Sequence, residues 1–281
     1  MITILTPTYN RRHLLERLYI SLKKQSSLDF EWLIIDDGST DDTFELIDDF
    51  TKESIIRIRY FFKANGGKHT ALNIGFEKAK GKWLMVVDSD DYLLTDCVGR
   101  LGKVISELED PFVSISFLRQ YDNGEIIGQQ FSLNEGTYID NMELGVSGDK
   151  ADIFRTDIVR NFRFPEYRNE TFMAESPLFL YVSQIGMTKF INFSGHVTEY
   201  CDDGLTKNIG INSIHCLNST LYVLSCKYKY LNKFSLKTKY ASVWWRYWLE
   251  RPSYSNIEIV PIIYLPLGFY LFLKSRLKKI I

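Results

Sequence analysis

Net charge of either sign is almost absent from this sequence. Its 281 residues carry 34 Lys and Arg against 35 Asp and Glu, which leaves a formal net charge of −1. Proteins that hold nucleic acid through its phosphates need a surplus of basic residues, so we expect no nucleic-acid partner. Cysteine is also scarce, with four residues in the chain. These four form no CxxC pair and show no zinc-ligand spacing. We expect reduced thiols in a cytoplasmic protein.

Several common motifs are missing as well. The first strand-like segment is followed by Pro7-Thr8-Tyr9-Asn10. This segment supplies neither the GxGxxG of a Rossmann dinucleotide site nor the glycines and lysine of a P-loop. The sequence shows no internal repeat and no low-complexity linker. It opens Met-Ile-Thr-Ile-Leu-Thr-Pro, without the basic leader of a signal peptide, so we expect none.

Residues 1–100 alternate between strand-like and helix-like segments. The expected strands are 2–5, 30–35, 56–62 and 83–87, and the expected helices are 12–25, 41–52 and 68–80. This is the pattern of an α/β fold with a mostly parallel central sheet flanked by helices. Ligands bind such sheets at the carboxyl ends of the strands, and three of these ends carry the polar groups of residues 8–10, 36–37 and 88–91.

The pattern changes from about residue 111. We expect two strands, 112–119 and 125–131, joined by a hairpin-type turn at 121–124. Residues 149–160 and 174–184 are expected to be helical, and residues 190–200 to form a strand.

The acidic sequence Asp88-Ser89-Asp90-Asp91 directly follows an apolar strand. Like charges gathered at a sheet edge repel one another and lose hydration. A hard divalent cation with oxygen ligands is the natural counter-charge, and one held by only one or two carboxylates keeps room for a nucleotide diphosphate. A solvated acidic turn is the alternative. An EF-hand calcium loop does not fit, because Tyr92 stands where an oxygen ligand is needed.

Four motifs follow one another along the first hundred residues. They are Thr6-Pro7-Thr8-Tyr9-Asn10, then Ile34-Ile35-Asp36-Asp37-Gly38-Ser39-Thr40-Asp41, then Asn65-Gly66-Gly67 with Asn73-Ile74-Gly75 and Ala79-Lys80-Gly81, then Val87-Asp88-Ser89-Asp90-Asp91. In this order and spacing they resemble the inverting family 2 glycosyltransferases, whose fold is called GT-A. The likeness is strong over residues 1–100, weaker to about residue 205 and essentially absent from the tail. It implies a nucleotide-sugar-binding half at 1–100, an acceptor-binding half at 101–205 and a C-terminal helical extension at 206–281.

The resemblance implies a site for a nucleotide-sugar donor, a UDP-sugar being favoured because Asp37 would accept the N3–H of uracil. Capping of the following helix is the alternative role for Asp37, and a plain surface position is the alternative for Lys68. Asp90 and Asp91 are the expected ligands of Mn²⁺ or Mg²⁺. The residues implied to surround the donor nucleotide are Pro7, Thr8, Tyr9, Asp37, Lys68, Asp88 and Asp90.

The family takes its general base from a Glu-Asp pair that opens a helix. Aligning the chain by Phe179 puts Ala174-Glu175 at that place, so the resemblance implies Glu175 as the base, one methylene longer than the usual Asp. Glu170 and Asp149 are the alternatives, and a role in the first helical turn is the plain interpretation of Glu175. His196 and Asn73 are expected to be structural. Residues 203–206 resemble the start of a mobile loop over the sugar.

The tail has a different character. Residues 259–273 carry no charge, and Lys274, Arg276, Lys278 and Lys279 follow directly. This run of fifteen residues is shorter than the ~20 that span a bilayer. An apolar segment with a basic flank fits insertion at an anionic membrane face. Packing on the protein's own domain and a spanning helix are the alternatives, and residues 244–248 either add to the membrane contact or pack inside.

These features predict a metal-dependent inverting glycosyltransferase of the hexosyltransferase type. It would move a sugar from a UDP-sugar to the hydroxyl of a glycan or lipid-linked glycan, for cell-surface polysaccharide, at the inner face of the cell membrane. The rival from another class is a non-catalytic nucleotide-fold scaffold in a polysaccharide complex. A nucleotidyltransferase is disfavoured, because no glycine-rich basic loop follows the first strand.

Overall fold

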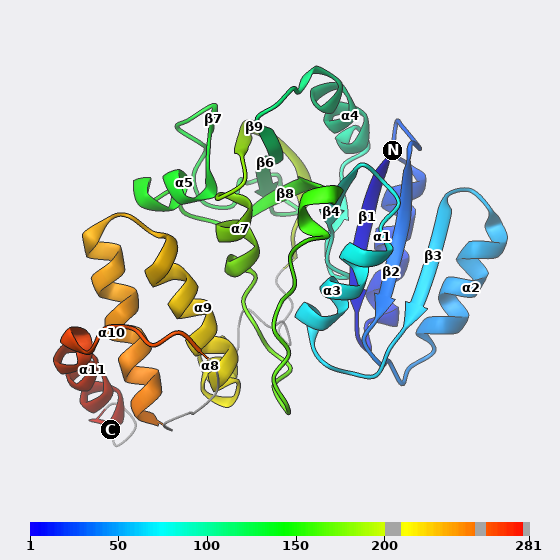
Figure 1. The fold of residues 1–281 in the computed structure, drawn as a ribbon. Coiled ribbons are helices and arrows are strands. Elements are labelled where there is room, and N and C mark those ends of the chain that lie inside the picture. Colours follow the sequence, from blue (N-terminus) through cyan, green and yellow to red (C-terminus); the bar gives the residue numbers. More distant parts are fainter. Residues whose placement is uncertain (200–208, 251–256, 278–281) are drawn as a thin grey trace.

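The structure is a computed structural model that describes residues 1–199, 209–250 and 257–277 (Figure 1). In these residues nine strands form one mixed sheet, in the order β3-β2-β1-β4-β8-β6-β9-β5, with β7 paired to β9. The strands are β1 (Ile2–Thr8), β2 (Phe30–Asp36), β3 (Arg57–Phe62), β4 (Trp83–Val86), β5 (Tyr92–Leu93), β6 (Phe112–Gln120), β7 (Glu135–Gly136), β8 (Lys150–Arg155) and β9 (Met187–Val197).

Helices cover both faces of the sheet, and a group of helices at the C-terminal end lies beside it (Figure 1). The helices of the sheet domain are α1 (Arg12–Lys23), α2 (Thr43–Glu53), α3 (Lys68–Lys78), α4 (Cys97–Glu107), α5 (Tyr138–Leu144), α6 (Thr156–Val159) and α7 (Ser176–Val182). The C-terminal lobe comprises α8 (Ile209–His215), α9 (Leu217–Tyr230), α10 (Phe234–Glu250), the 3₁₀ turn η1 (Ile262–Tyr264) and α11 (Leu265–Leu277).

The first four strands are parallel, as the alternating sequence predicts. β1 pairs in parallel with β2 and β4, and β2 pairs in parallel with β3. Their carboxyl ends therefore meet at one edge of the sheet. This confirms the predicted α/β class, and it brings the segments after β1, β2 and β4 together.

Both faces of β1 and β2 are buried, which explains the continuous apolar runs of these two strands. Ile4 and Ile34 face a core cluster that contains residues of α1, α2 and α4. Leu5 and Leu33, their neighbours in sequence, face a second cluster with residues of α3, α6 and α7. The alternation of side chains along a strand thus builds one core on each side of the sheet.

Two predictions for the second half were wrong. Residues 149–160, predicted to be helical, form β8 and the short α6. The segment joins the sheet because it pairs antiparallel with both β4 and β6, so position 149 does not begin an acceptor-side helix. Residues 125–131 make only an isolated bridge between Gln120 and Ile126, because the chain turns at Gly128, whose φ is +72°. Helix α4 was not anticipated.

The C-terminal lobe has its own apolar core, to which Trp244, Trp245 and Tyr247 contribute buried side chains. The aromatic stretch 244–248 therefore packs inside the lobe. Helix α11 packs along α10, yet of its residues only Gly268 is buried. No helix in the described ranges is long and apolar enough to cross a membrane.

Candidate active site

One cavity of about 1120 Å³ lies over the carboxyl ends of β1, β2 and β4 and extends across β6, β8 and β9. All the site residues predicted from the sequence line it, although they come from four separate motifs and the α7 region. They are Pro7, Thr8, Tyr9, Asp37, Lys68, Asp88, Asp90, Asp91 and Glu175.

Asp88, Asp90 and Asp91, which we call the acidic cluster, follow β4. Their side chains converge because the chain turns tightly there, and the amide of Asp91 donates to the carbonyl of Asp88. One carboxylate oxygen from each of Asp88, Asp90 and Asp91 lies within 4.8 Å of the others. Burial, with Asp88 and Asp91 beside it, raises the pKa of Asp90 to about 6. Oxygen ligands that converge in this way suit a hard divalent cation.

The side chain of Asp91 is held by residues of β6 and β9. Its Oδ2 lies 2.6 Å from Nε2 of His196 on β9 and 3.1 Å from Nη1 of Arg119 on β6. Both His196 and Asp91 are buried. Burial and the nearby Arg119 lower the pKa of His196. His196 is thus a structural support for the acidic cluster, as the sequence analysis expects.

Lys68 joins the acidic cluster to the predicted base. It is the first residue of α3, and its Nζ lies 2.7 Å from Oδ1 of Asp88 and 2.6 Å from Oε1 of Glu175. Burial alone would lower the pKa of this ammonium, but the two carboxylates outweigh it and raise the pKa. Lys68 is therefore a cation inside the site and not a plain surface lysine.

Glu175 reaches this position because α7 begins directly after it, with Pro177 in the first turn. Pro is well suited to a helix start, where its missing N–H leaves no partner unsatisfied. The sequence offered two alternatives for the base. One of them, Asp149, also lines the cavity. Glu170 instead accepts hydrogen bonds from the amides of Asn218 and Ser219 and so caps α9.

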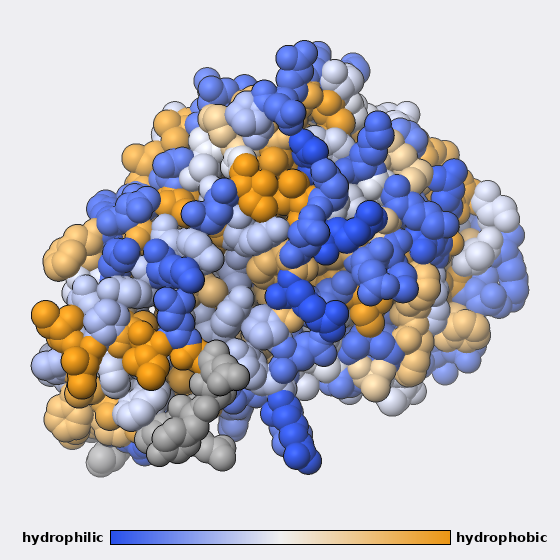
Figure 2. All heavy atoms as spheres, viewed as in Figure 1, coloured by the Kyte–Doolittle hydropathy of each residue, from blue (hydrophilic) through white to orange (hydrophobic). Residues whose placement is uncertain are grey.

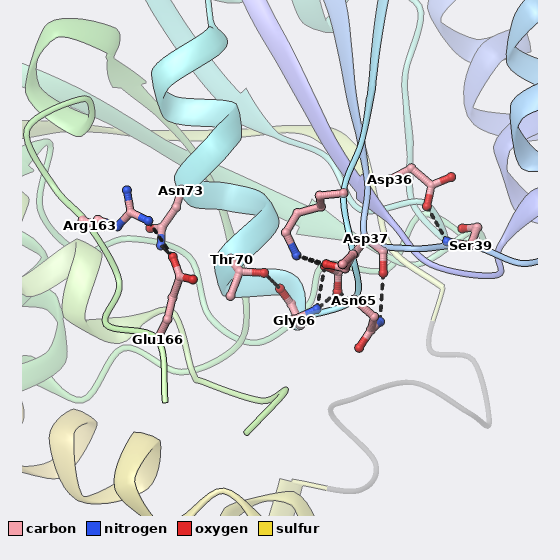
Figure 3. Close-up of polar contacts among 12 residues, drawn as sticks. Asp36, Asp37, Ser39, Asn65, Gly66, Thr70, Asn73, Arg163 and Glu166 are labelled. Carbon is pink, nitrogen blue, oxygen red and sulfur yellow. Dashed lines mark hydrogen bonds and ion pairs between the residues drawn. The ribbon is translucent and has the colours of Figure 1, made fainter. Parts of the chain in front are cut away.

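Asp37 holds the loop before α3 (Figure 3). Its carboxylate accepts hydrogen bonds from the amides of Gly66 and Gly67, at 3.0 and 2.7 Å, and from the side chains of Lys63 and Asn65. It does not cap the following helix, since α2 has no side-chain cap. The loop it fixes delivers Lys68 to the cavity.

Two expectations remain, one for Asn73 and one for the loop at 203–206. The amide group of Asn73 exchanges hydrogen bonds with the backbone of Phe164 and donates to Glu166 (Figure 3), so Asn73 packs and does not face the cavity. The expected loop at 203–206 lies outside the described residues.

Sequence reasoning missed the far wall of the cavity. Ser114 and Ser116 on β6, Asp152 on β8 and Thr188 on β9 line it, together with Asn141 on α5. The alternation of Lys150, Asp152 and Phe154 on one strand face is the signal that points to this wall. It was hidden because the segment was predicted to be helical.

The fold and the site define an α/β protein with a cavity lined by acidic residues at the carboxyl ends of its parallel strands. Comparison with known proteins names the family. The profile described as "Glycosyl transferase family 2" matches residues 3–157, more than half of the 281 residues. The chain belongs to glycosyltransferase family 2.

Solved structures of low sequence identity share the fold. TarS of S. aureus, in complex with UDP-GlcNAc, has a TM-score of 0.65 and 16% identity, with 95% of this chain and 83% of that chain covered. The mannosyltransferase PcManGT of Pyrobaculum calidifontis, in complex with GDP-Man and Mn²⁺, has a TM-score of 0.57 and 15% identity, with coverages of 98% and 74%. The chain therefore has a GT-A fold.

A curated relative is the GalNAc(5)-diNAcBac-PP-undecaprenol beta-1,3-glucosyltransferase of Campylobacter jejuni. It is 28% identical over 179 residues, which cover 60% of this chain and 57% of the relative. The chain spans only 20% to 35% of the length of several other curated relatives that it matches. The family is thus shown, while the reaction is a matter of proposal.

Proposed function

We propose that the protein is a metal-dependent inverting glycosyltransferase that moves a sugar from a UDP-sugar to an acceptor hydroxyl. The observation that carries the proposal is the single cavity in which Asp37, the acidic cluster and Glu175 all meet. Lys68 contacts both the cluster and Glu175. A cation site beside a carboxylate base suits glycosyl transfer from a nucleotide diphosphate, because one group stabilises the leaving group and the other takes the acceptor proton.

Asp88, Asp90 and Asp91 would hold Mn²⁺ or Mg²⁺. The fit is supported by the convergence of their oxygens. In the described part of the chain, no hydrogen bond or ion pair joins the Asp90 carboxylate to another residue, which leaves it open to a ligand. When bound, a divalent cation neutralises the charge that develops on the departing nucleoside diphosphate.

Lys68 would add a second positive charge for the diphosphate. Its ammonium stands at the start of α3, where the helix dipole also favours anions. The side chain already touches Asp88 and Glu175. Contact of the ammonium with a phosphate would compete with these two contacts and so would free Glu175.

Glu175 would act as the general base. The acceptor oxygen attacks the anomeric carbon while its proton passes to a carboxylate oxygen of Glu175, and the bond from that carbon to the phosphate oxygen breaks. Attack from the side opposite to the leaving group inverts the configuration at the anomeric carbon.

Pro7, Thr8 and Tyr9 would form the wall of the nucleoside pocket, with Asp37 as acceptor for the uracil N3–H. The Tyr9 side chain is 46% exposed, which leaves its ring accessible to a base. Asp37 already accepts four hydrogen bonds, so Lys63 or Asn65 must give up one of them when uridine binds.

The acceptor is proposed to be a lipid-linked glycan of cell-surface polysaccharide synthesis, at the inner face of the cell membrane. The C. jejuni relative is named for such an acceptor. Hydrophobic side chains gather on the surface of the C-terminal lobe (Figure 2). Exposed members of this apolar surface are Ile259, Ile262, Ile263, Leu267, Phe269, Tyr270 and Leu273, and Lys274 and Arg276 follow in the last turn of α11.

Calorimetric titration of UDP tests the donor site. Wild-type protein should bind UDP tightly only with Mn²⁺, and Asp90→Asn should lose roughly tenfold or more in affinity, as expected for loss of a charged ligand. Asp49→Asn, on the exposed surface of α2, is the matched control and should bind like wild type. Binding that is equally tight without Mn²⁺, or unchanged in Asp90→Asn, would contradict the proposal.

A further inference from the structure

The far wall of the cavity carries hydroxyls and a carboxylate in ordered rows. Ser116 of β6 lies opposite Asp152 of β8, and Ser114 of β6 lies opposite Thr188 of β9. We call Ser114, Ser116, Asp152 and Thr188 the polar floor. Because residues two apart on a strand share a face, all four side chains look into the cavity that they line.

The polar floor is already partly organised. Ser114 Oγ lies 2.7 Å from Thr188 Oγ1, and the Ser116 hydroxyl stands close enough to the Asp152 carboxylate to lower the pKa of Asp152. A carboxylate offers about four acceptor positions, so Asp152 has acceptor capacity for a ligand. Groups held in this way are preorganised for a ligand and lose little freedom when it binds.

A buried acceptor without a partner stands on the same cavity wall. Asn141 of α5 is only 7% exposed, and its Oδ1 finds no hydrogen-bond donor among the described residues. An unsatisfied buried polar atom is costly, and Asn141 lines the cavity. This acceptor is therefore available to a donor group of a bound ligand.

Aromatic rings frame the polar floor. Phe131 stacks on Phe190 with centroids 5.0 Å apart, and Tyr138 stacks on Phe179 at 4.8 Å. All four rings line the cavity. A wall of apolar rings around a few convergent polar groups is the usual makeup of a small-molecule site, and it suits a sugar ring, which has C–H faces and a rim of hydroxyls.

The polar floor also adjoins the predicted base. Asp152 lies near enough to Glu175 and Arg119 for their charges to act on it. It belongs to β8, on the opposite side of β4 from the strands β1 and β2 that carry the nucleoside-pocket residues. A ring bound on the floor thus lies beside Glu175 and away from the nucleoside.

We propose that the polar floor, with Asn141 and the surrounding rings, is a subsite that binds a neutral sugar ring through its hydroxyl groups. Asp152 and Asn141 Oδ1 accept hydrogen bonds from these hydroxyls, and the rings cover a C–H face. The inference rests on the proposed function, and the ring belongs either to the donor sugar or to the glycan acceptor.

The test uses Asp152→Asn, which keeps the shape of the side chain, and Asp157→Asn as the matched control, since Asp157 faces solvent on α6. Calorimetry measures the affinity for UDP, UDP-glucose, UDP-galactose and UDP-N-acetylglucosamine in the presence of Mn²⁺. Saturation-transfer NMR then measures binding of the methyl glycosides of the same sugars to the protein–UDP–Mn²⁺ complex. Asn141→Leu repeats both measurements at the second acceptor.

Asp152→Asn should bind UDP as wild type does. A loss of roughly tenfold or more for a UDP-sugar alone assigns the floor to the donor sugar, and loss of the methyl glycoside signal assigns it to the acceptor. Either result supports the subsite. Folded Asp152→Asn and Asn141→Leu proteins that keep both kinds of binding would overturn it. Failure of wild type to bind UDP would instead defeat the proposed function.

Discussion

Glu175 and Lys68 illustrate how much the chemistry depends on single residues. The ion pair between them, at 2.6 Å, holds the carboxylate next to the acidic cluster. Glu175 departs from the Asp of the family pattern, yet its longer side chain reaches the cavity from the start of α7. Under the proposed function, this contact would couple binding of the diphosphate to release of the base through one lysine.

Glu175→Gln should leave UDP binding within about twofold of wild type and lower the turnover number by roughly 10²- to 10⁴-fold, because the amide cannot take the acceptor proton. The measurement is the rate of UDP release from UDP-sugar with a polyprenyl-diphosphate-linked glycan. Asp149→Asn is the comparison, since Asp149 is the alternative base lining the same cavity. Near-normal turnover in the Gln variant would remove Glu175 from the mechanism.

Asp152 should make stability depend on pH in an unusual direction. Burial raises its pKa from 3.8 to about 6, with Glu175 adding to the rise and Ser116, Arg119 and Lys150 opposing it. The folded state therefore holds the proton more tightly than the unfolded state. The stabilising contribution of this group is full below the unfolded pKa and is lost as the pH rises through about 6.

Asp152→Asn should consequently gain stability relative to wild type as the pH rises from 4.5 to 7.5, by at most ~3 kcal/mol. Melting temperatures across this range measure the difference. Asp157→Asn should show the opposite trend, because its hydrogen bond to Arg155 lowers the pKa of Asp157. If the melting temperature of Asp152→Asn relative to wild type stayed constant or fell with rising pH, burial would not raise the pKa of Asp152.

Among the elements, the parallel strands were the most predictable from sequence. β1 and β2 are buried on both faces, so they appear as continuous apolar runs with polar residues at their ends. β8 was not predicted, because its neighbours in the sheet, β4 and β6, are distant in the chain. Six residues with three buried positions, two on one face and one on the other, fit a helix or a strand equally well.

The residues of the candidate site likewise fall into two groups, those in local sequence motifs and those that strand pairing brings in. Asp37, Asp88, Asp90 and Asp91 belong to local motifs, so their types and spacing are visible in the sequence. The supports of Asp91, by contrast, come from β6 and β9. A pairing across the sheet leaves no local pattern, which is why Arg119 and the polar floor become apparent only in the folded structure.

The loop before α3 gives a prediction at the scale of an element. Gly67 has a φ of +93°, and a Cβ there would lie 1.9 Å from the carbonyl oxygen of Thr171. Gly67→Ala should destabilise the protein by roughly 2 kcal/mol or more and weaken UDP binding, because Lys68 is displaced. Urea unfolding and calorimetry measure these effects.

Gly102→Ala is the matched control for that substitution. Gly102 lies within α4, and a Cβ there would meet no atom within 4 Å. The substitution should stabilise the protein by about 0.5–1 kcal/mol through helix propensity. If both alanine variants shifted the unfolding midpoint in the same direction, the close approach of the loop to Thr171 would not be the cause.

At the scale of the molecule, the active-site cavity and the apolar surface lie on different parts of the chain. The cavity belongs to the sheet domain, and the apolar surface belongs to α11 and the residues just before it. Glu170 connects the sheet domain to the C-terminal lobe. It directly precedes the segment that leads to Glu175, and its carboxylate accepts hydrogen bonds from the first amides of α9. Docking of the lobe on a membrane would hold the cavity near a lipid-linked acceptor.

Ile262 and Ile263, which are 71% and 79% exposed, should be the main apolar contacts with lipid. Replacing both by Ser should reduce binding to vesicles of phosphatidylglycerol and phosphatidylcholine by roughly tenfold or more. Sedimentation with vesicles measures this, and Ile55→Ser, at an exposed site after α2, is the control. Wild-type binding to vesicles that the double substitution leaves unchanged would place the contact elsewhere.

We propose that the acidic cluster, Asp37 and Glu175 surround one nucleotide-sugar site. The most direct measurement is a crystal structure with UDP and Mn²⁺, with anomalous data collected at the manganese edge. We expect one anomalous peak within coordination distance of the Asp90 carboxylate, with the diphosphate between that peak and Lys68 and uracil next to Tyr9. Ordered UDP bound away from this cavity, or a manganese peak with no contact to the acidic cluster, would contradict it.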